Sequence, residues 1–186
     1  MRKMTRFPTL AAIFALALCA ARSEAQRVSP AATLASATAL GVPNVREPSP
    51  GLLTAGQLSQ AQMDGLAEAG VATFVSLRLP EEEGAGWEEA YARERGVSFA
   101  RIPIGGSADL TRANAEALDR ILDAAGGKPA VVYCGSGNRA GALLALRAHW
   151  LDGMPAAQAL ELGKAAGMTR LERAVAKLLG IAGGTP

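Results

Sequence analysis

The chain has 186 residues, of which 19 are basic and 17 acidic, so its formal net charge is only +2. This balance, without a stripe of lysine and arginine interleaved with aromatic residues, argues against nucleic acid as a partner. The length is sufficient for one domain with a hydrophobic core of its own.

The first 25 residues have the pattern of a signal peptide. Arg2, Lys3 and Arg6 precede an apolar run from Leu10 to Ala21, which is shorter than the roughly 20 residues that span a bilayer. Small residues stand at both ends of Ser23-Glu24-Ala25, at the two positions that a signal peptidase reads. We therefore expect cleavage after this triplet, no stable membrane insertion afterwards, and a periplasmic or secreted location. An uncleaved anchor or a lipoprotein is the alternative.

Cysteine usage changes when the leader is removed. Cys19 leaves with it, so Cys134 becomes the only cysteine, and 15 basic and 16 acidic residues remain. A single thiol excludes an internal disulfide, and one cysteine with one histidine, His149, does not make an ordinary zinc site. Cys134 is therefore either a buried apolar side chain or a thiol that is kept for its chemistry.

The rest of the chain divides into a lead-in and a domain. Residues 26–50 are rich in Ala, Ser, Thr and Pro and are predicted to form a flexible lead-in. Over residues 51–182, short apolar runs alternate with amphipathic stretches, which is typical of an α/β domain. The predicted strands are 52–54, 71–77, 97–104 and 129–133, and the predicted helices are 59–69, 87–95, 111–125, one from about 138, 155–166 and 169–179. Because helices join the strands, we expect three layers, with helices on both faces of a mostly parallel central sheet of four to five strands.

The loop from Cys134 to Arg139 lies between a buried strand and a buried helix. In an open parallel sheet, ligands bind beyond the carboxyl ends of the strands, where this loop is expected. Gly135 and Gly137 allow successive backbone N–H groups to converge on one point, and the helix N-terminus adds its positive end there. Arg139 adds a planar, two-pronged donor for an oxyanion, and Ser136 adds a hydroxyl. The same features favour the thiolate of Cys134.

The segment from Val132 to Arg139 resembles two known families. One is the cysteine-based phosphatase superfamily, in particular the bacterial beta-lactamase-hydrolase-like phosphatases, and the other is the rhodanese sulfurtransferases. Its Cys-x4-Arg spacing is one residue shorter than the Cys-x5-Arg of most tyrosine and dual-specificity phosphatases, and many rhodaneses have the shorter spacing. The loop alone therefore leaves both families open.

Segments outside the loop favour the phosphatases. Leu77-Arg78-Leu79-Pro80-Glu81 is weakly similar to the Asp-x-Arg strand of rhodaneses, but their Gly-His-Ile-Pro-Gly-Ala-like stretch and their Gly-Gly strand end are absent. The order of segments over about residues 43–180 resembles the beta-lactamase-hydrolase-like phosphatases. The matching segments are Gly56-Gln57-Leu58-Ser59, Gly70-Val71, the strand to Arg78, the run from Val97 to Ile104, Asp152-Gly153-Met154-Pro155 and Ala166-Gly167-Met168.

The phosphatase resemblance implies roles for particular residues. Cys134 would attack phosphorus and form a phosphocysteine. Arg139 and the amides of residues 135–138, including Asn138, would bind the phosphoryl oxygens. Asp109, in the loop after the preceding strand, would be the general acid, although it precedes a helix and capping that helix is the alternative. The substrate would be a phosphorylated small molecule or protein, and neither a metal nor a cofactor is implied.

Three departures from the family pattern bear on activity. The loop is short, Tyr133 replaces the usual histidine, and Ala140 replaces a Ser or Thr whose hydroxyl helps the thiolate to leave. Slow turnover, an unusual substrate or a non-catalytic module that binds oxyanions or phosphoproteins would follow from these changes.

Two further features are weighed against structural explanations. Glu81-Glu82-Glu83 is interpreted as a solvated turn. Arg78 follows a strand that ends near the loop, so it either approaches the pocket or forms a structural salt bridge.

Overall fold

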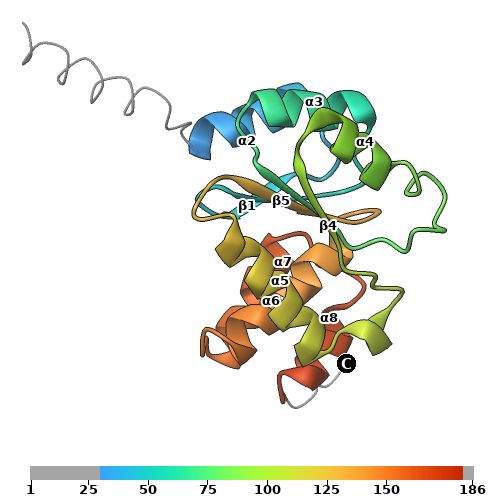
Figure 1. Ribbon diagram of the computed structural model, residues 1–186. Coiled ribbons are helices and arrows are strands. Elements are labelled where there is room, and N and C mark those ends of the chain that lie inside the picture. Colours follow the sequence, from blue (N-terminus) through green and yellow to red (C-terminus); the bar gives the residue numbers. More distant parts are fainter. Residues whose placement is uncertain (1–29, 182–186) are drawn as a thin grey trace, which may run out of the picture.

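A five-stranded sheet forms the centre of the protein, whose computed structural model describes residues 30–181 (Figure 1). Its strands are β1 (Arg46–Ser49), β2 (Leu52–Ala55), β3 (Thr73–Ser76), β4 (Ser98–Arg101) and β5 (Ala130–Tyr133), in the spatial order β1-β2-β5-β3-β4. The pair β1–β2 is antiparallel and the other three pairs are parallel. This confirms the predicted mostly parallel sheet. The predicted signal peptide, residues 1–25, lies outside the described residues.

The three central strands end level with one another. Ala55 at the end of β2 and Ser76 at the end of β3 both stand opposite Tyr133 at the end of β5. One residue further on, the N–H of Leu77 donates to Tyr133 and the N–H of Cys134 donates to Ala55, at 2.8 and 3.2 Å. The loops that follow all three strands therefore meet at one edge of the sheet.

Helices cover both faces of the sheet, as predicted (Figure 1). One face carries α2 (Pro30–Ala39), α3 (Gln60–Glu68) and α4 (Glu88–Arg95). The other face carries α5 (Arg112–Ala124), α6 (Asn138–Trp150), α7 (Ala156–Ala165) and α8 (Glu172–Leu178). Each face encloses its own hydrophobic cluster. Burial on both faces explains why β5 is apolar at every position.

The alternation of side chains along β5 directs the cysteine toward α6. Val131 and Tyr133 belong to the cluster under α2–α4, whereas Val132 and Cys134 belong to the cluster under α5–α8. Successive side chains of a strand point to opposite faces, so this assignment follows from the strand itself. Cys134 thus leaves the strand on the side where α6 begins.

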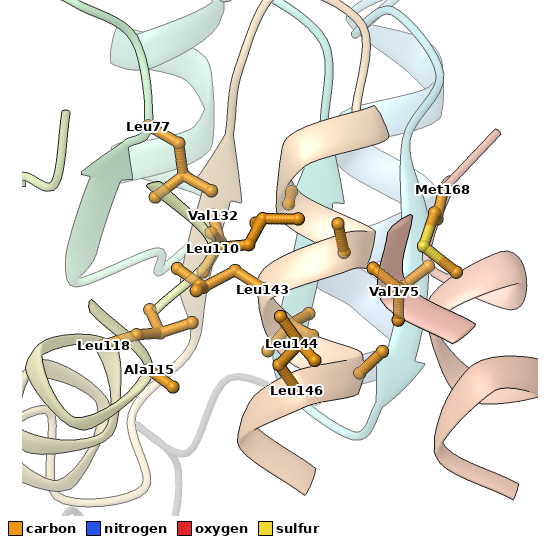
Figure 2. Close-up of a cluster of buried hydrophobic side chains, with 14 of the residues drawn as sticks. Leu77, Leu110, Ala115, Leu118, Val132, Leu143, Leu144, Leu146, Met168 and Val175 are labelled. Atoms are coloured by element: carbon orange, nitrogen blue, oxygen red, sulfur yellow. The ribbon is translucent and has the colours of Figure 1, made fainter. Parts of the chain in front are cut away.

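Helix α6 is buried nearly all round, as its apolar sequence predicts. Figure 2 shows Leu143, Leu144 and Leu146 of α6 between Leu118 of α5 and Val175 of α8. Among residues 30–181, no helix, α6 included, is both long and apolar enough to cross a membrane.

The predicted flexible lead-in is wrong from residue 30 onward. Pro30–Ala39 forms α2 and Arg46–Ser49 forms β1, and only residues 26–29 of that segment lie outside the structure. Ala37 and Val42 are buried against the α3 layer. Packing on α3 stabilises α2, and pairing with β2 stabilises β1. The Ala-, Ser- and Pro-rich composition of this segment does not indicate either interaction.

The strand predicted for residues 97–104 is longer than the observed β4, but the chain continues to follow β3 beyond it. Ser98–Arg101 pairs with β3, and Ile102 and Ile104 then donate to the carbonyls of Ser76 and Leu77. Residues 102–104 therefore still follow β3, although they are not part of the regular strand. They bring the next loop to the edge where the cysteine loop lies.

Helices α6 and α7 approach so closely at Gly141 that no side chain fits there. A Cβ added at Gly141 would lie 2.4 Å from the carbonyl oxygen of Gly163 and 2.5 Å from the backbone nitrogen of Met168. We predict that Gly141→Ala lowers the free energy of unfolding by about 3 kcal/mol, because two backbone segments must move apart. Urea denaturation measures this, with Gly106→Ala as the control, since a Cβ at Gly106 meets nothing within 4 Å. Equal losses in the two variants would contradict the prediction.

Candidate active site

A four-residue turn, Cys134 to Gly137, connects β5 with α6. Gly137 caps α6 with φ 85°, in the left-handed region that favours glycine. Its carbonyl accepts the N–H of Gly141 at 2.9 Å, which starts the helix directly after the turn. The turn therefore ends at the positive end of a 13-residue helix.

The carbonyls of the turn are held from outside. The N–H of Gln57 donates to the carbonyl of Gly135 at 3.4 Å, and the Asn44 amide donates to the carbonyl of Ser136 at 3.3 Å. Within residues 30–181, no acceptor contacts the backbone N–H of Gly135 or Ser136. The peptide groups of the turn are thus oriented with free donors for an anion.

Cys134 lies at the bottom of this turn and is 1% exposed. It packs in the hydrophobic cluster that includes α6, five residues before Arg139 in the sequence. The pKa of Arg139 is raised above its ordinary value, first by the hydrogen bond to Glu82 and also by the charge of Cys134. The influence of Cys134 on Arg139 indicates that the sulfur and the guanidinium lie in the same neighbourhood.

The guanidinium of Arg139 is fixed along one edge. Nη1 and Nη2 donate to the two carboxylate oxygens of Glu82 at 2.6 and 2.8 Å, and Nη1 also donates to the carbonyl of Ile104 at 2.6 Å. These contacts use three of the five N–H groups of the guanidinium. Within residues 30–181, no oxygen acceptor occupies the opposite edge, Nε–H and the second Nη2–H, and a Cβ added at Gly135 would lie 3.6 Å from Nη2. This edge can donate to an oxyanion beside the sulfur.

Glu82 is a site residue that sequence analysis missed. Besides Arg139, its carboxylate accepts from Nε of Arg78 at 2.9 Å and from the N–H of Leu79 at 2.8 Å. The hydrogen bond from Arg139 is the main reason why the pKa of Glu82 falls from 4.5 to about 2. The solvated turn predicted for Glu81–Glu83 is therefore wrong for Glu82. The one available signal was the position of Glu82 in the loop that follows β3.

Asp109 lies in the loop that Arg139 touches. One of its oxygens, Oδ2, accepts the N–H groups of Gly105 and Gly106 at 2.7 and 3.2 Å, and Gly105 directly follows Ile104, the carbonyl partner of Arg139. Asp109 does not cap α5, because Thr111 does so by accepting the N–H of Asn114. The carboxylate instead closes its own loop next to the Arg139 contact.

The remaining predicted residues differ in whether they face solvent or the neighbouring loops. Gly135 is exposed and Ser136 is half-buried, so both lie at the mouth of the turn. The side chain of Asn138 does not reach the pocket, because its oxygen accepts the N–H groups of Thr169 and Leu171 at 2.8 and 3.2 Å. Asn138 therefore ties the turn to the loop before α8, and only its backbone remains a candidate for binding.

The ion pair of Glu82 predicts an acid-dependent loss of stability. Its folded-state pKa is depressed, so its contribution is complete above about 4.5 and is lost as pH falls through about 2. We predict that Glu82→Gln is less stable than the wild type at neutral pH and that this difference shrinks toward about pH 2. Urea titrations of both proteins across this range measure the effect, and a difference that stays constant down to pH 2 would contradict it.

The fold is shared with solved phosphatase structures. A DUF442 protein of Shewanella putrefaciens CN-32 is 22% identical with a TM-score of 0.59, and 75% of this chain and 93% of that chain are covered. The nma1982 protein of Neisseria meningitidis Z2491 is 23% identical with a TM-score of 0.59, covering 75% and 99%. A cysteine-to-serine form of P. aeruginosa TpbA, solved in complex with pTyr, is 18% identical with a TM-score of 0.53, covering 72% and 81%.

Sequence comparison adds the family. No curated protein matches the chain. The family described as Swiss Army Knife protein, DSP-PTPase phosphatase domain matches residues 43–177, which include the cysteine turn, Glu82 and Asp109. The resemblance to the cysteine-based phosphatase superfamily is therefore confirmed, and this chain belongs to the DSP-PTPase phosphatase domain family of Swiss Army Knife proteins.

Proposed function

We propose that the protein hydrolyses phosphate monoesters through a phosphocysteine on Cys134. The observation that carries the proposal is the position of the Arg139 guanidinium, which Glu82 holds along one edge while Nη2 lies beside Gly135, the residue after Cys134. A thiolate next to an oxyanion site is suited to attack on phosphorus. Membership of a phosphatase domain family supports the same chemistry.

In the first step, Sγ of Cys134 attacks phosphorus while the bond between phosphorus and the ester oxygen breaks. The electron pair of that bond goes to the leaving oxygen, which takes a proton. Arg139 and the amides of Gly135 and Ser136 hold the three non-bridging oxygens. Asp109 is the proposed proton donor, because its loop begins at Ile104, which Arg139 contacts directly.

In the second step, water attacks the phosphocysteine, the bond between phosphorus and sulfur breaks, and inorganic phosphate and the thiolate are released. Asp109, now deprotonated, takes a proton from the water. Ala140 is fully buried and follows Arg139 without a hydroxyl for the departing sulfur. The intermediate is therefore expected to last long enough to be trapped.

Substrate class and location form the finer part of the proposal. TpbA was solved with pTyr, and we infer that this chain accepts aryl phosphates, with tyrosine or dual-specificity protein substrates among them. The order of segments over residues 43–180 supports the beta-lactamase-hydrolase-like branch of the superfamily. The signal-peptide pattern of residues 1–25 supports a periplasmic or secreted enzyme.

The central prediction concerns Cys134. The purified mature protein should hydrolyse an aryl phosphate, be inhibited by vanadate, and gain the mass of one phosphoryl group on Cys134 when the reaction is quenched in acid. Cys134→Ser should lose at least about a thousandfold in kcat, because a neutral hydroxyl is a far weaker nucleophile than a thiolate. Equal rates for both proteins would rule out the mechanism, and a gain of one sulfur from thiosulfate would indicate a sulfurtransferase instead.

The role of Asp109 is tested with two leaving groups. Asp109→Asn should lower kcat about a hundredfold for an alkyl phosphate, whose leaving oxygen needs a proton, and much less for an activated aryl phosphate. Circular dichroism controls for folding, since the amide can still accept from Gly105 and Gly106. An unchanged rate with the alkyl phosphate would remove Asp109 as the general acid.

A further inference from the structure

A chain of alternating charges runs from Arg139 along the edge of the sheet to a buried carboxylate. Arg139 pairs with Glu82, and Glu82 pairs with Arg78, which is 8% exposed. At the far end, Glu88 of α4 is 0% exposed and pairs with Arg101 of β4 at 2.9 Å. Helices α4 and α6 cover opposite faces of the sheet, so this chain of charged side chains extends from one face to the other.

Gln57 is the neutral link of this chain. Its amide nitrogen donates to Glu88 at 2.7 Å, and its amide oxygen accepts from Nη1 of Arg78. A carboxylate on one side and a guanidinium on the other determine which way the amide points. The backbone N–H of the same residue donates to the carbonyl of Gly135 in the cysteine turn. Gln57 therefore contacts the turn directly and Arg139 through Arg78 and Glu82.

Glu88 is the costly member of the chain. A fully buried carboxylate is unfavourable unless it is paired and hydrogen-bonded. Its carboxylate accepts hydrogen bonds from Arg101 and Gln57. Burial of the Tyr133 hydroxyl is the main cause that raises the pKa of Tyr133, and the charge of Glu88 is the second. The hydroxyl of Tyr133 is buried without a hydrogen-bond partner among residues 30–181. Apolar side chains at this place would pack without the cost of burying a charge. Packing alone therefore does not explain why Glu88 is a carboxylate.

We propose that Gln57 and Glu88 are positioning residues for Arg139. The inference rests on the proposed function, since it concerns the same oxyanion site. Glu88 orients Gln57, Gln57 anchors Arg78, and Arg78 holds the Glu82 carboxylate at the place where it takes one edge of Arg139. The free edge of the guanidinium is thereby aimed at the cysteine turn before a substrate arrives. Preorganised donors of this kind are the ones that stabilise a transition state most.

Exchanging the two link residues tests the chain. Gln57→Glu puts a second carboxylate against Glu88, and Glu88→Gln leaves Arg101 without its anion. The double variant Gln57→Glu/Glu88→Gln restores the links between Arg78, residue 57, residue 88 and Arg101, because the new glutamate accepts from Arg78 and from the new glutamine, and Arg101 donates to the new amide oxygen. It loses only the hydrogen bond from the Gln57 amide to the carbonyl of Leu58 at 3.0 Å. Each single variant should bind vanadate about tenfold more weakly, the size of one charge-assisted hydrogen bond. The double variant should recover to within about threefold of the wild type.

A second measurement separates positioning from general stability. The Nε–H signal of Arg139 in ¹H–¹⁵N spectra, assigned with Arg139→Lys, reports whether the guanidinium is held in one orientation, with or without catalysis. It should be sharp in the wild type and the double variant and broadened in both single variants. Gln62→Leu is the matched control, because Gln62 donates to the carbonyls of Leu40 and Gly41 away from the site. This control should lose stability and keep both the vanadate affinity and the signal.

Each outcome decides the proposal. Folded single variants with wild-type vanadate affinity and a sharp signal would overturn it, and so would a folded double variant that recovers neither. Should Glu88→Gln fail to fold, Gln57→Leu, which leaves the Glu88–Arg101 pair intact, takes its place with the same expected loss. A wild type that binds no vanadate would refute the proposed function, and the Arg139 signal alone would then decide whether the chain positions the guanidinium.

Discussion

The pairing of β5 with parallel strands on both sides is the constraint on which the site depends. Because β2, β5 and β3 end in register, the residues that follow them, Gly56, Cys134 and Leu77, are brought together at one edge. The loop after β2 holds the carbonyl of Gly135 in the cysteine turn, and the segment after β3 supplies the carboxylate for Arg139. A shift of one residue in either pairing would turn Cys134 to the opposite face and separate it from α6.

The charged side chains at this edge form ion pairs with one another instead of being exposed to solvent. Arg78, Glu82, Arg101 and Glu88 are each buried or half-buried, and each contacts an opposite charge. Because a low-dielectric environment strengthens such contacts and penalises any that is broken, the five charged side chains that end at Arg139 form a rigid arrangement. They carry three positive and two negative charges, and Arg139 stands at the end of the series next to the cysteine turn.

Local sequence signals led to most of the elements and to the centre of the site. The strands around Val75 and Val132 were recognisable from short apolar runs, and Ser59 caps α3 by accepting the N–H of Gln62. Glu82 was missed because its partner Arg139 is 57 residues away, and no periodicity connects the two. The hydrogen bond between the Asn138 side chain and Thr169 was not predicted for a similar reason, since Thr169 lies in a distant loop.

The sequence by itself determined that a cysteine, two glycines and an arginine follow a buried strand and open a buried helix, because each of these signals lies within a few neighbouring residues. Only the tertiary structure decided which side chains surround that turn. The order of the strands placed Gln57, Arg78 and Asp109 at a common edge, and packing against α3 turned an Ala- and Ser-rich segment into α2. The physical reason is range: backbone preference and helix caps act between near neighbours, whereas ion pairs and burial depend on the positions of segments far apart in the chain.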